Sequence, residues 1–215
     1  MDSLLDQFSR SLQTGIEIET PFRHWLLERV LPDEICAAIR ALPFAPPAIA
    51  DTAGKRETHN STRTFFSVEN RRRFAVCQEL AETLQNPAAV ERIEARCATR
   101  LGGSFLRIEY CQDTEGFWLE PHTDIGAKLF TMLIYLSPDD AAAAWGTDLM
   151  TPTGEVLSSA PSLANNGLVF LPGQNTWHGF RKRPIEGVRR SLIVNYVRDE
   201  WRSRHELAFP DRPVA

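Results

Sequence analysis

The chain has 215 residues, of which 43% are hydrophobic and 24% are charged, and its formal net charge is -4. This length and composition are typical of a globular protein with one substantial core. No apolar run approaches the roughly 20 residues that a membrane helix needs, and residues 1–15 lack the basic and apolar parts of a secretion signal. We therefore expect a cytoplasmic protein without a membrane partner. The negative charge argues against nucleic acid as a partner, because phosphate binding usually needs a basic surface.

Two local features bear on partners and redox state. The basic clusters at 71–73 and 181–183 fit either a solvated surface or a patch for an anionic substrate. None of the four cysteines forms a CxxC pair. We therefore expect reduced, mostly buried thiols and no cysteine-based zinc site.

The first half of the chain is predicted to be mainly helical. Apolar residues at helical spacing predict helices over 31–42 and 69–85. Asn86 and Pro87 are a typical cap and first residue of a third helix, which a pair of glycines should end. Segment 43–64 is rich in proline, small and polar residues, so we expect a long loop that could cover a site.

The character of the sequence changes at residue 104. Short alternating or apolar segments, separated by proline and glycine turns, predict about eight strands with no helix between them. Helices followed by strands indicate an α+β fold, and the strands suggest a double-stranded β-helix, that is, a cupin-like jelly roll. We expect one domain over 1–215, with the N-terminal helices packed on one outer face. In this division 1–103 supplies helical support and a lid loop, 104–198 the jelly-roll core, and 199–215 a C-terminal tail.

Two residues in the segment "EPHTDIGAKLF" are candidate metal ligands. His122 and Asp124 are two positions apart, and side chains at i and i+2 of a strand point to the same face. His178 follows more than 50 residues later beside another turn, and a jelly roll can bring such distant strands together. Two histidines and one carboxylate are the ligands of non-haem Fe(II) oxygenases, and the same three could bind zinc. The alternative is a surface histidine and an aspartate that caps a turn.

The last predicted strand, 188–197, carries a candidate anion site. Arg189 and Ser191 share a face that is unusually polar for a strand in the core. A buried guanidinium needs an anion, and its fork matches a carboxylate in a bidentate way. The partner could be a ligand carboxylate or an acid of the protein. Arg190 leaves open which arginine faces inward, and parity with Ser191 favours Arg189.

The order of these motifs, H-x-D, a distant histidine and then R-x-S, resembles the 2-oxoglutarate/Fe(II)-dependent dioxygenase superfamily, in particular its prolyl-4-hydroxylase-like branch. The likeness covers residues 104–198 and a first helix near 30–42. It includes "FLRIEYCQDTEGFWLEPHTD", "KLFTMLIYLS" and "NNGLVFLPGQNTWHGF", which resemble the strands around the family's ligands. "WGTDLM" lies where the family has a Gly-Gly-acid-Leu strand, with Thr147 in place of the second glycine.

The resemblance implies a role for each matching residue. His122, Asp124 and His178 would bind Fe(II). The cosubstrates would be 2-oxoglutarate and O₂, with ascorbate as an optional reductant. Arg189 would bind the distal carboxylate of 2-oxoglutarate with the help of Ser191. Further implied contacts to 2-oxoglutarate are Tyr110, Thr131 and Tyr135.

The implied reaction is hydroxylation of a C–H bond in a peptidyl or small-molecule substrate, with release of succinate and CO₂. Asp124 favours hydroxylation, since halogenation needs this carboxylate removed. We expect a monomer or homodimer. The candidates for lining the substrate pocket, each of which could instead serve packing or the surface, are Trp118, Trp145 and Arg63, with Phe65 and Phe66.

Two other functions fit part of this pattern. A zinc- or manganese-dependent hydrolase or isomerase of the cupin kind would share the barrel and the three ligands but would not need Arg189 and Ser191. A non-catalytic jelly-roll binding module would need none of these residues. Binding and turnover of 2-oxoglutarate separate the oxygenase from both alternatives.

Overall fold

Antiparallel strands form two facing sheets in the computed structural model, which describes residues 3–56 and 63–215. The larger sheet contains, in spatial order, β1 (Ile16–Ile18), β2 (His24–Leu27), β9 (Gly167–Phe170), β6 (Lys128–Tyr135), β11 (Arg189–Val197), β4 (Phe105–Asp113) and β3 (Thr64–Phe65). The smaller sheet contains β5 (Leu119–His122), β10 (His178–Phe180), β7 (Asp148–Met150) and β8 (Val156–Ser159). From β4 onward the chain crosses repeatedly between the sheets, which confirms the predicted double-stranded β-helix.

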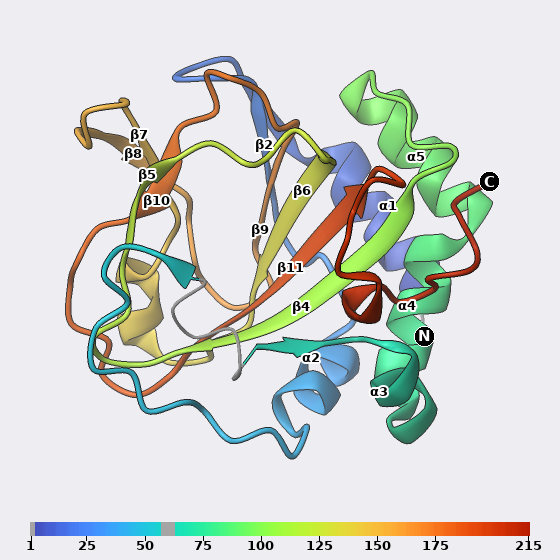
Figure 1. The fold of residues 1–215 in the computed structure, drawn as a ribbon, viewed down its shortest axis with the longest axis horizontal. Helices are drawn as coiled ribbons and strands as arrows, with labels where there is room; N and C mark the ends of the chain where they lie inside the picture. The colour runs from blue at the N-terminus through green and yellow to red at the C-terminus, as the bar shows by residue number, and fades with distance from the viewer. Residues whose placement is uncertain (1–2, 57–62) are drawn as a thin grey trace.

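The helices gather on the side of the large sheet away from the small sheet (Figure 1). This arrangement confirms the predicted α+β class. No helix in the described part of the chain combines the length and the apolar character needed to cross a membrane. The helices are α1 (Leu4–Thr14), α2 (Asp33–Arg40), α3 (Val68–Arg73), α4 (Ala75–Gln85) and α5 (Pro87–Cys97), with short 3-10 helices η2 (Asp140–Ala144) and η3 (Arg204–Glu206) in later loops.

The N-terminal part differs from its prediction in several places. The strands β1, β2 and β3 were not predicted, because strands of two to four residues are too short to show a periodic pattern. The helix α1 was not predicted either, although its buried residues Leu4, Phe8 and Leu12 have helical spacing. The helix predicted over 69–85 is interrupted at Phe74, whose backbone is extended (φ -128°, ψ 116°). The ring of Phe74 packs edge-on against Phe44, with centroids 5.4 Å apart. Residues 57–62 of the predicted lid loop lie outside the described residues.

The third predicted helix begins as expected. Asn86 caps α5 by accepting a hydrogen bond from the amide of Ala88, and Pro87 is its first residue. The helix ends at Cys97, and the next residue, Ala98, takes the left-handed conformation (φ 54°) before the two glycines are reached. The boundary was therefore predicted a few residues too late.

The main hydrophobic core lies between the helices and the outer face of the large sheet. Leu192, Val194 and Tyr196 on β11 are fully buried there, and burying such a side chain contributes about 1.5–3 kcal/mol. The residues of opposite parity, from Arg189 to Asn195, face the space between the sheets. The outer face therefore holds the fold together, and the inner face is left for polar chemistry.

The cysteines belong to the buried structure. All four are free and buried. Burial raises the pKa of Cys36 to about 11 and the pKa of Cys77, Cys97 and Cys111 to about 12. These thiols are protonated and unreactive at neutral pH, in line with the prediction of reduced, buried cysteines.

Candidate active site

The structure brings the three predicted metal ligands together at the open edge between the sheets. His122 ends β5 and His178 begins β10, and their Cα atoms are paired across the small sheet. Their ring centroids are 4.4 Å apart. One side-chain ligand atom from each of His122, Asp124 and His178 lies within 4.8 Å of the other two. This spacing suits a single ion with two nitrogen ligands and one oxygen ligand.

Backbone carbonyls fix the tautomer of both imidazoles. Nδ1 of His122 lies 2.8 Å from the carbonyl oxygen of Glu120, and Nδ1 of His178 lies 2.9 Å from that of Thr176. A carbonyl can only accept, so each Nδ1 carries the proton and each Nε2 keeps its lone pair. Burial, and then the neighbouring His122, lowers the pKa of His178 to about 4 despite the opposing charge of Asp124. A neutral His178 is the form that binds a metal.

Both carboxylate oxygens of Asp124 have a protein donor. Lys128 Nζ lies 2.5 Å from Oδ1, and Thr131 Oγ1 donates to Oδ2 at 2.7 Å. Burial favours the neutral acid, but the charge of Lys128, the neighbouring His178 and the two hydrogen bonds hold the pKa of Asp124 well below its usual range. The carboxylate is therefore ionised, as a metal ligand must be.

A buried hydrogen-bonded chain extends from Asp124 across the inner face of the large sheet. Asn195 Nδ2 donates to Thr131 Oγ1 at 2.9 Å, and Arg107 Nη1 donates to Asn195 Oδ1 at 3.0 Å. Because a guanidinium can only donate, Arg107 fixes the orientation of the Asn195 amide. The amide then fixes the Thr131 hydroxyl as a donor to Asp124. Arg107 itself is held by Glu206 at 2.6 Å and by Glu109 at 2.9 Å.

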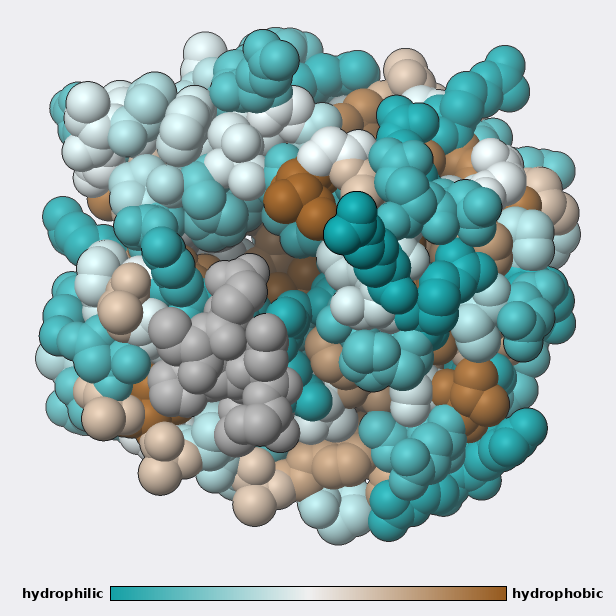
Figure 2. Space-filling model, in the orientation of Figure 1, coloured by the Kyte–Doolittle hydropathy of each residue, from teal (hydrophilic) through white to brown (hydrophobic). Residues whose placement is uncertain are grey.

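A cavity of about 360 Å³ lies between the sheets at this centre. Leu133 of β6 and Ile193 of β11 form part of its apolar wall. Figure 2 shows the hollow near the middle of this face, with hydrophobic atoms inside it. The acidic residues that line the cavity are Glu109, Glu120 and Asp124, and the basic ones are Lys55, Arg56, Arg63, Arg107, Lys128 and Arg189. Cations thus concentrate here in a chain whose net charge is negative.

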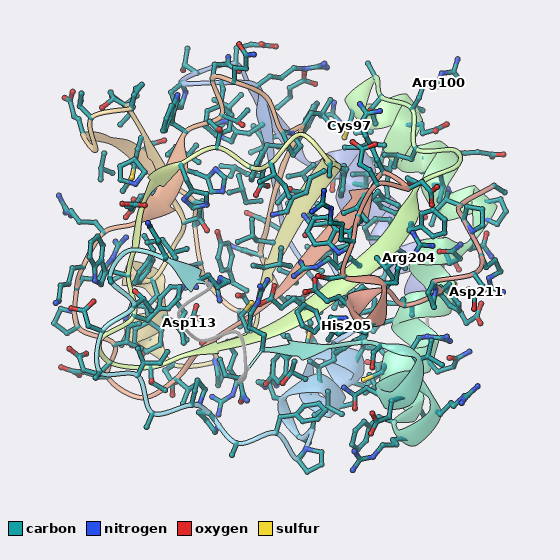
Figure 3. The ribbon with its side chains drawn as sticks, viewed as in Figure 1. Cys97, Arg100, Asp113, Arg204, His205 and Asp211 are labelled. Carbon is teal, nitrogen blue, oxygen red and sulfur yellow. The ribbon has the colours of Figure 1, made fainter. Side chains whose placement is uncertain are left out.

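Arg189 lines this cavity and also pairs with a protein acid. Its Nη1 lies 2.5 Å from Asp113 Oδ2, its Nε donates to the carbonyl of Trp145 at 2.7 Å, and its guanidinium stacks 4.6 Å from the Phe180 ring centroid. Arg56 donates to the other oxygen of Asp113 at 3.0 Å. Asp113 lies at the end of β4 away from α4 and α5 (Figure 3). One carboxylate therefore serves two guanidinium groups at this end of the cavity.

The buried hydroxyl of Ser191 indicates that an anion fits beside Arg189. Ser191 follows Arg189 at the next position of the same face, and its Oγ is buried with no hydrogen-bond partner among the residues described. A buried hydroxyl without a partner is costly. A ligand carboxylate bound to the Arg189 guanidinium would supply this partner, so the residues present fit 2-oxoglutarate. Arg190 has the opposite parity and shares the outer face with Leu192.

The other three residues predicted to contact 2-oxoglutarate are Tyr110, Thr131 and Tyr135. Each of them either lies away from the cavity or has a hydrogen-bond partner in the protein. Tyr110 pairs with Leu192 and lies on the outer face of β4 in the main core, so the structure does not bring it to the cavity. Thr131 faces inward but donates to Asp124. Tyr135 also faces inward, yet its hydroxyl donates to Thr147 Oγ1 at 2.9 Å and accepts from the Thr147 amide at 3.2 Å. Tyr135 thus anchors the segment that leads into β7.

Of the residues predicted to line the substrate pocket, some lie at the cavity and others lie away from it. Arg63 lines the cavity and binds Glu109 with two hydrogen bonds of 2.9 and 2.7 Å. Trp118 lies outside the cavity lining, and its indole donates to Asp51 at 2.6 Å. The ring of Trp145 is buried in a separate apolar cluster, and its indole donates to a carbonyl at 3.2 Å. Only the backbone carbonyl of Trp145 contacts the site, through Arg189. Phe65 lies within 5.3 Å of the Arg63 guanidinium, whereas Phe66 is fully buried in the main core.

Several residues of the site were missed by sequence reasoning. The inward parity of β4 carries Arg107, Glu109 and Asp113, which alternate with the apolar residues of that strand. This alternation was a usable signal for a polar inner face. Lys128 lies four residues after Asp124, on the far side of a turn. The alternation of side chains along a strand therefore could not predict that the two residues are in contact.

Solved oxygenase structures are similar to this chain in fold. A prolyl-4-hydroxylase from Pseudomonas putida is 14% identical and has a TM-score of 0.57, covering 92% of this chain and 96% of its own. A 2OG-Fe(II) oxygenase family protein from Burkholderia pseudomallei is 14% identical, with a TM-score of 0.57 and coverage of 92% of each chain. The chain has the fold of these oxygenases.

A third structure is a prolyl hydroxylase from Trichoplax adhaerens, in complex with a peptide fragment of the hypoxia inducible factor oxygen degradation domain. It is 13% identical and has a TM-score of 0.53, covering 92% of this chain and 90% of its own. No protein-family model matches the chain, and neither does any curated protein sequence. The likeness predicted from the motifs is therefore confirmed as a likeness of fold, and the chemistry depends on the residues of the site.

Proposed function

We propose that the protein is an Fe(II)- and 2-oxoglutarate-dependent dioxygenase that hydroxylates a C–H bond. The observation that carries this proposal is the convergence of His122, Asp124 and His178 at one end of a cavity that Arg189 also lines. Ser191 follows Arg189 at the next position of the same face, and its buried hydroxyl has no hydrogen-bond partner among the described residues. A zinc hydrolase has no use for the second pair. In the overall reaction, one oxygen atom of O₂ enters the substrate C–H bond, and the other enters succinate as 2-oxoglutarate loses CO₂.

Each residue of the centre has a defined task in this function. The Nε2 atoms of His122 and His178 and one oxygen of Asp124 would hold the iron, which supplies the oxidation of the C–H bond when bound. Arg189 would bind the distal carboxylate of 2-oxoglutarate, and the Ser191 hydroxyl would donate to it. Thr131 keeps Asp124 in place. The apolar side chains of Leu133 and Ile193 would limit the access of water to the reacting groups.

The substrate is proposed to be a small molecule or a peptide. Prolyl hydroxylases with the same fold support a peptidyl substrate, and the Trichoplax enzyme is solved with a peptide fragment. The size of the cavity, about 360 Å³, supports a small molecule or a single side chain.

The test uses two adjacent arginines of opposite parity. Purified protein with Fe(II), 2-oxoglutarate and O₂ should form succinate, measured by NMR. Arg189→Ala should lose this turnover, whereas Arg190→Ala, which changes the outer face of the same strand, should keep it. Tight zinc binding without 2-oxoglutarate binding or turnover would instead favour the cupin-type hydrolase.

A further inference from the structure

Lys128 places a cation directly beside the candidate metal ligands. It is the first residue of β6, its side chain is 18% exposed, and it lines the cavity. Its partner is Asp124, with Nζ 2.5 Å from Oδ1. Its charge also contributes to the lowered pKa of His178. Lys128 therefore shares its carboxylate with any metal ion that Asp124 binds.

Two other cations in the cavity wall already have matched acids. Arg63 and Arg107 both contact Glu109, and Arg107 also contacts Glu206. Two guanidinium groups thus face two carboxylates. Among the described residues, the charges of this part of the wall are therefore balanced, and we assign no substrate anion to it.

At the opposite end of the cavity, the described residues pair two guanidinium groups with one carboxylate. Arg56 and Arg189 share the single carboxylate of Asp113. The distal carboxylate of 2-oxoglutarate supplies a second negative charge under the function proposed above, on which this inference rests. The other carboxylate of 2-oxoglutarate and that of Asp124 would neutralise the two charges of Fe(II).

Among the residues that the structure describes, the acid that pairs with Lys128 is Asp124, and under the proposed function Asp124 would also neutralise part of the charge of the metal ion. Glu120 also lines the cavity but is exposed, so solvent screens it. Lys55 lines the rim and has interactions of its own. An ammonium held in a partly buried cavity without a counter-charge is unfavourable. A substrate that carries one negative charge would remove this cost.

We propose that the substrate is a small aliphatic monocarboxylate whose carboxylate binds Lys128. A phosphate ester carries close to two charges at neutral pH and would over-compensate a single ammonium. The aliphatic part has an apolar surface available in Leu133, Ile193 and Ile125, the last of which is 60% exposed at the rim, directly after the ligand Asp124. The cavity of about 360 Å³ must also hold 2-oxoglutarate, so the substrate is small.

The experiment compares carboxylates with their uncharged amides. Protein loaded with Mn(II) and 2-oxoglutarate is titrated by calorimetry with straight and branched carboxylates of four to eight carbons, including 4-methylpentanoate, and with the matched carboxamides. Wild-type protein should bind the best carboxylate about tenfold more tightly than its amide, the size expected for one charge-assisted hydrogen bond. Lys128→Gln should remove this preference, with the amide titrated into the same variant as the reference. Lys128→Arg should keep the preference, and so should the control Lys182→Gln, which changes an exposed lysine paired with Asp51.

The outcomes separate this inference from the function on which it rests. The binding of 2-oxoglutarate to the Mn(II) protein is measured first in every variant. If 2-oxoglutarate does not bind to the wild-type protein, the proposed function fails and the inference fails with it. If it binds but no carboxylate in the panel is preferred over its amide, or if Lys128→Gln retains the preference, only the monocarboxylate inference is overturned.

Discussion

The hydroxyl of Thr131 should control how tightly the centre binds metal. Among the described residues, Thr131 is the partner of Asp124 Oδ2, at 2.7 Å, and its own acceptor lone pair is taken by Asn195. Thr131→Val keeps the shape of the side chain and removes only the hydroxyl. Asp124 would then keep Lys128 on one oxygen and lose the contact that fixes its rotation.

The expected loss follows from two independent magnitudes. A hydrogen bond to a charged group contributes about 1.5–3 kcal/mol, which corresponds to a change of roughly tenfold to a hundredfold in affinity. Removing a group that orients a metal ligand typically costs about 10- to 100-fold in metal affinity. Asn195 keeps a second acceptor in the carbonyl of Phe130, at 3.3 Å, so the fold should lose little more than about 1 kcal/mol.

Calorimetric titration with Mn(II) measures this effect directly. Thr131→Val should bind Mn(II) about 10- to 100-fold more weakly than wild type, and Thr131→Ser should restore most of the affinity. Tyr135→Phe is the matched control, because it removes a buried hydroxyl from the same strand that contacts Thr147 and no metal ligand. Mn(II) affinity of Thr131→Val within about twofold of wild type would refute the reasoning, since the expected loss is at least about tenfold.

Three further predictions concern the cosubstrate end and the fold. Asp113→Asn should tighten 2-oxoglutarate binding by about tenfold in calorimetry, because Asp113 competes for the Arg189 guanidinium; weaker binding would show that Asp113 instead orients Arg189. Glu109→Gln should destabilise the protein by about 3–5 kcal/mol in urea unfolding at pH 7, since it removes the carboxylate charge from a buried ion pair with Arg107. Burial raises the pKa of Glu109, but the neighbouring arginines hold it far below the usual value. The contribution of Glu109 is thus present above the unfolded pKa of about 4.3 and is lost as the pH falls below it, so the difference between variant and wild type should narrow in acid and not widen. Tyr196→Phe should cost about 1 kcal/mol in the same assay, because it removes a fully buried donor to the Leu84 carbonyl; no change in the urea midpoint would contradict this.

The metal ligands could be predicted because their signal is local and periodic. His122 and Asp124 are two positions apart on one strand end, and Arg189 and Ser191 share a parity, so each pair needs only the alternation of a strand. For Tyr110 the alternation of the strand and the family resemblance gave different predictions, and the resemblance assigned it to 2-oxoglutarate. Tyr110 shares its parity with the apolar residues Leu106 and Ile108, so alternation alone placed it on the face that packs against the helices.

The partners of these residues depend on strand register, which the sequence does not reveal. Arg189 lies opposite Asp113 because β4 and β11 pair along nine residues, and a shift of one position would separate them. The same register places Asn195 between Arg107 and Thr131. The short strands β1 and β2 were missed for a related reason, since their position is decided by pairing with β9 and not by their own pattern.

Incorporation of ¹⁸O tests the proposed oxygenase most directly. Protein with Fe(II) and 2-oxoglutarate is exposed to ¹⁸O₂, and the succinate is analysed by mass spectrometry. The proposed function predicts succinate that carries one ¹⁸O atom, and His122→Ala should form none above the level of free iron. Succinate without ¹⁸O, or equal labelling with the His122→Ala protein, would contradict the assignment of His122, Asp124 and His178 as an oxygenase centre.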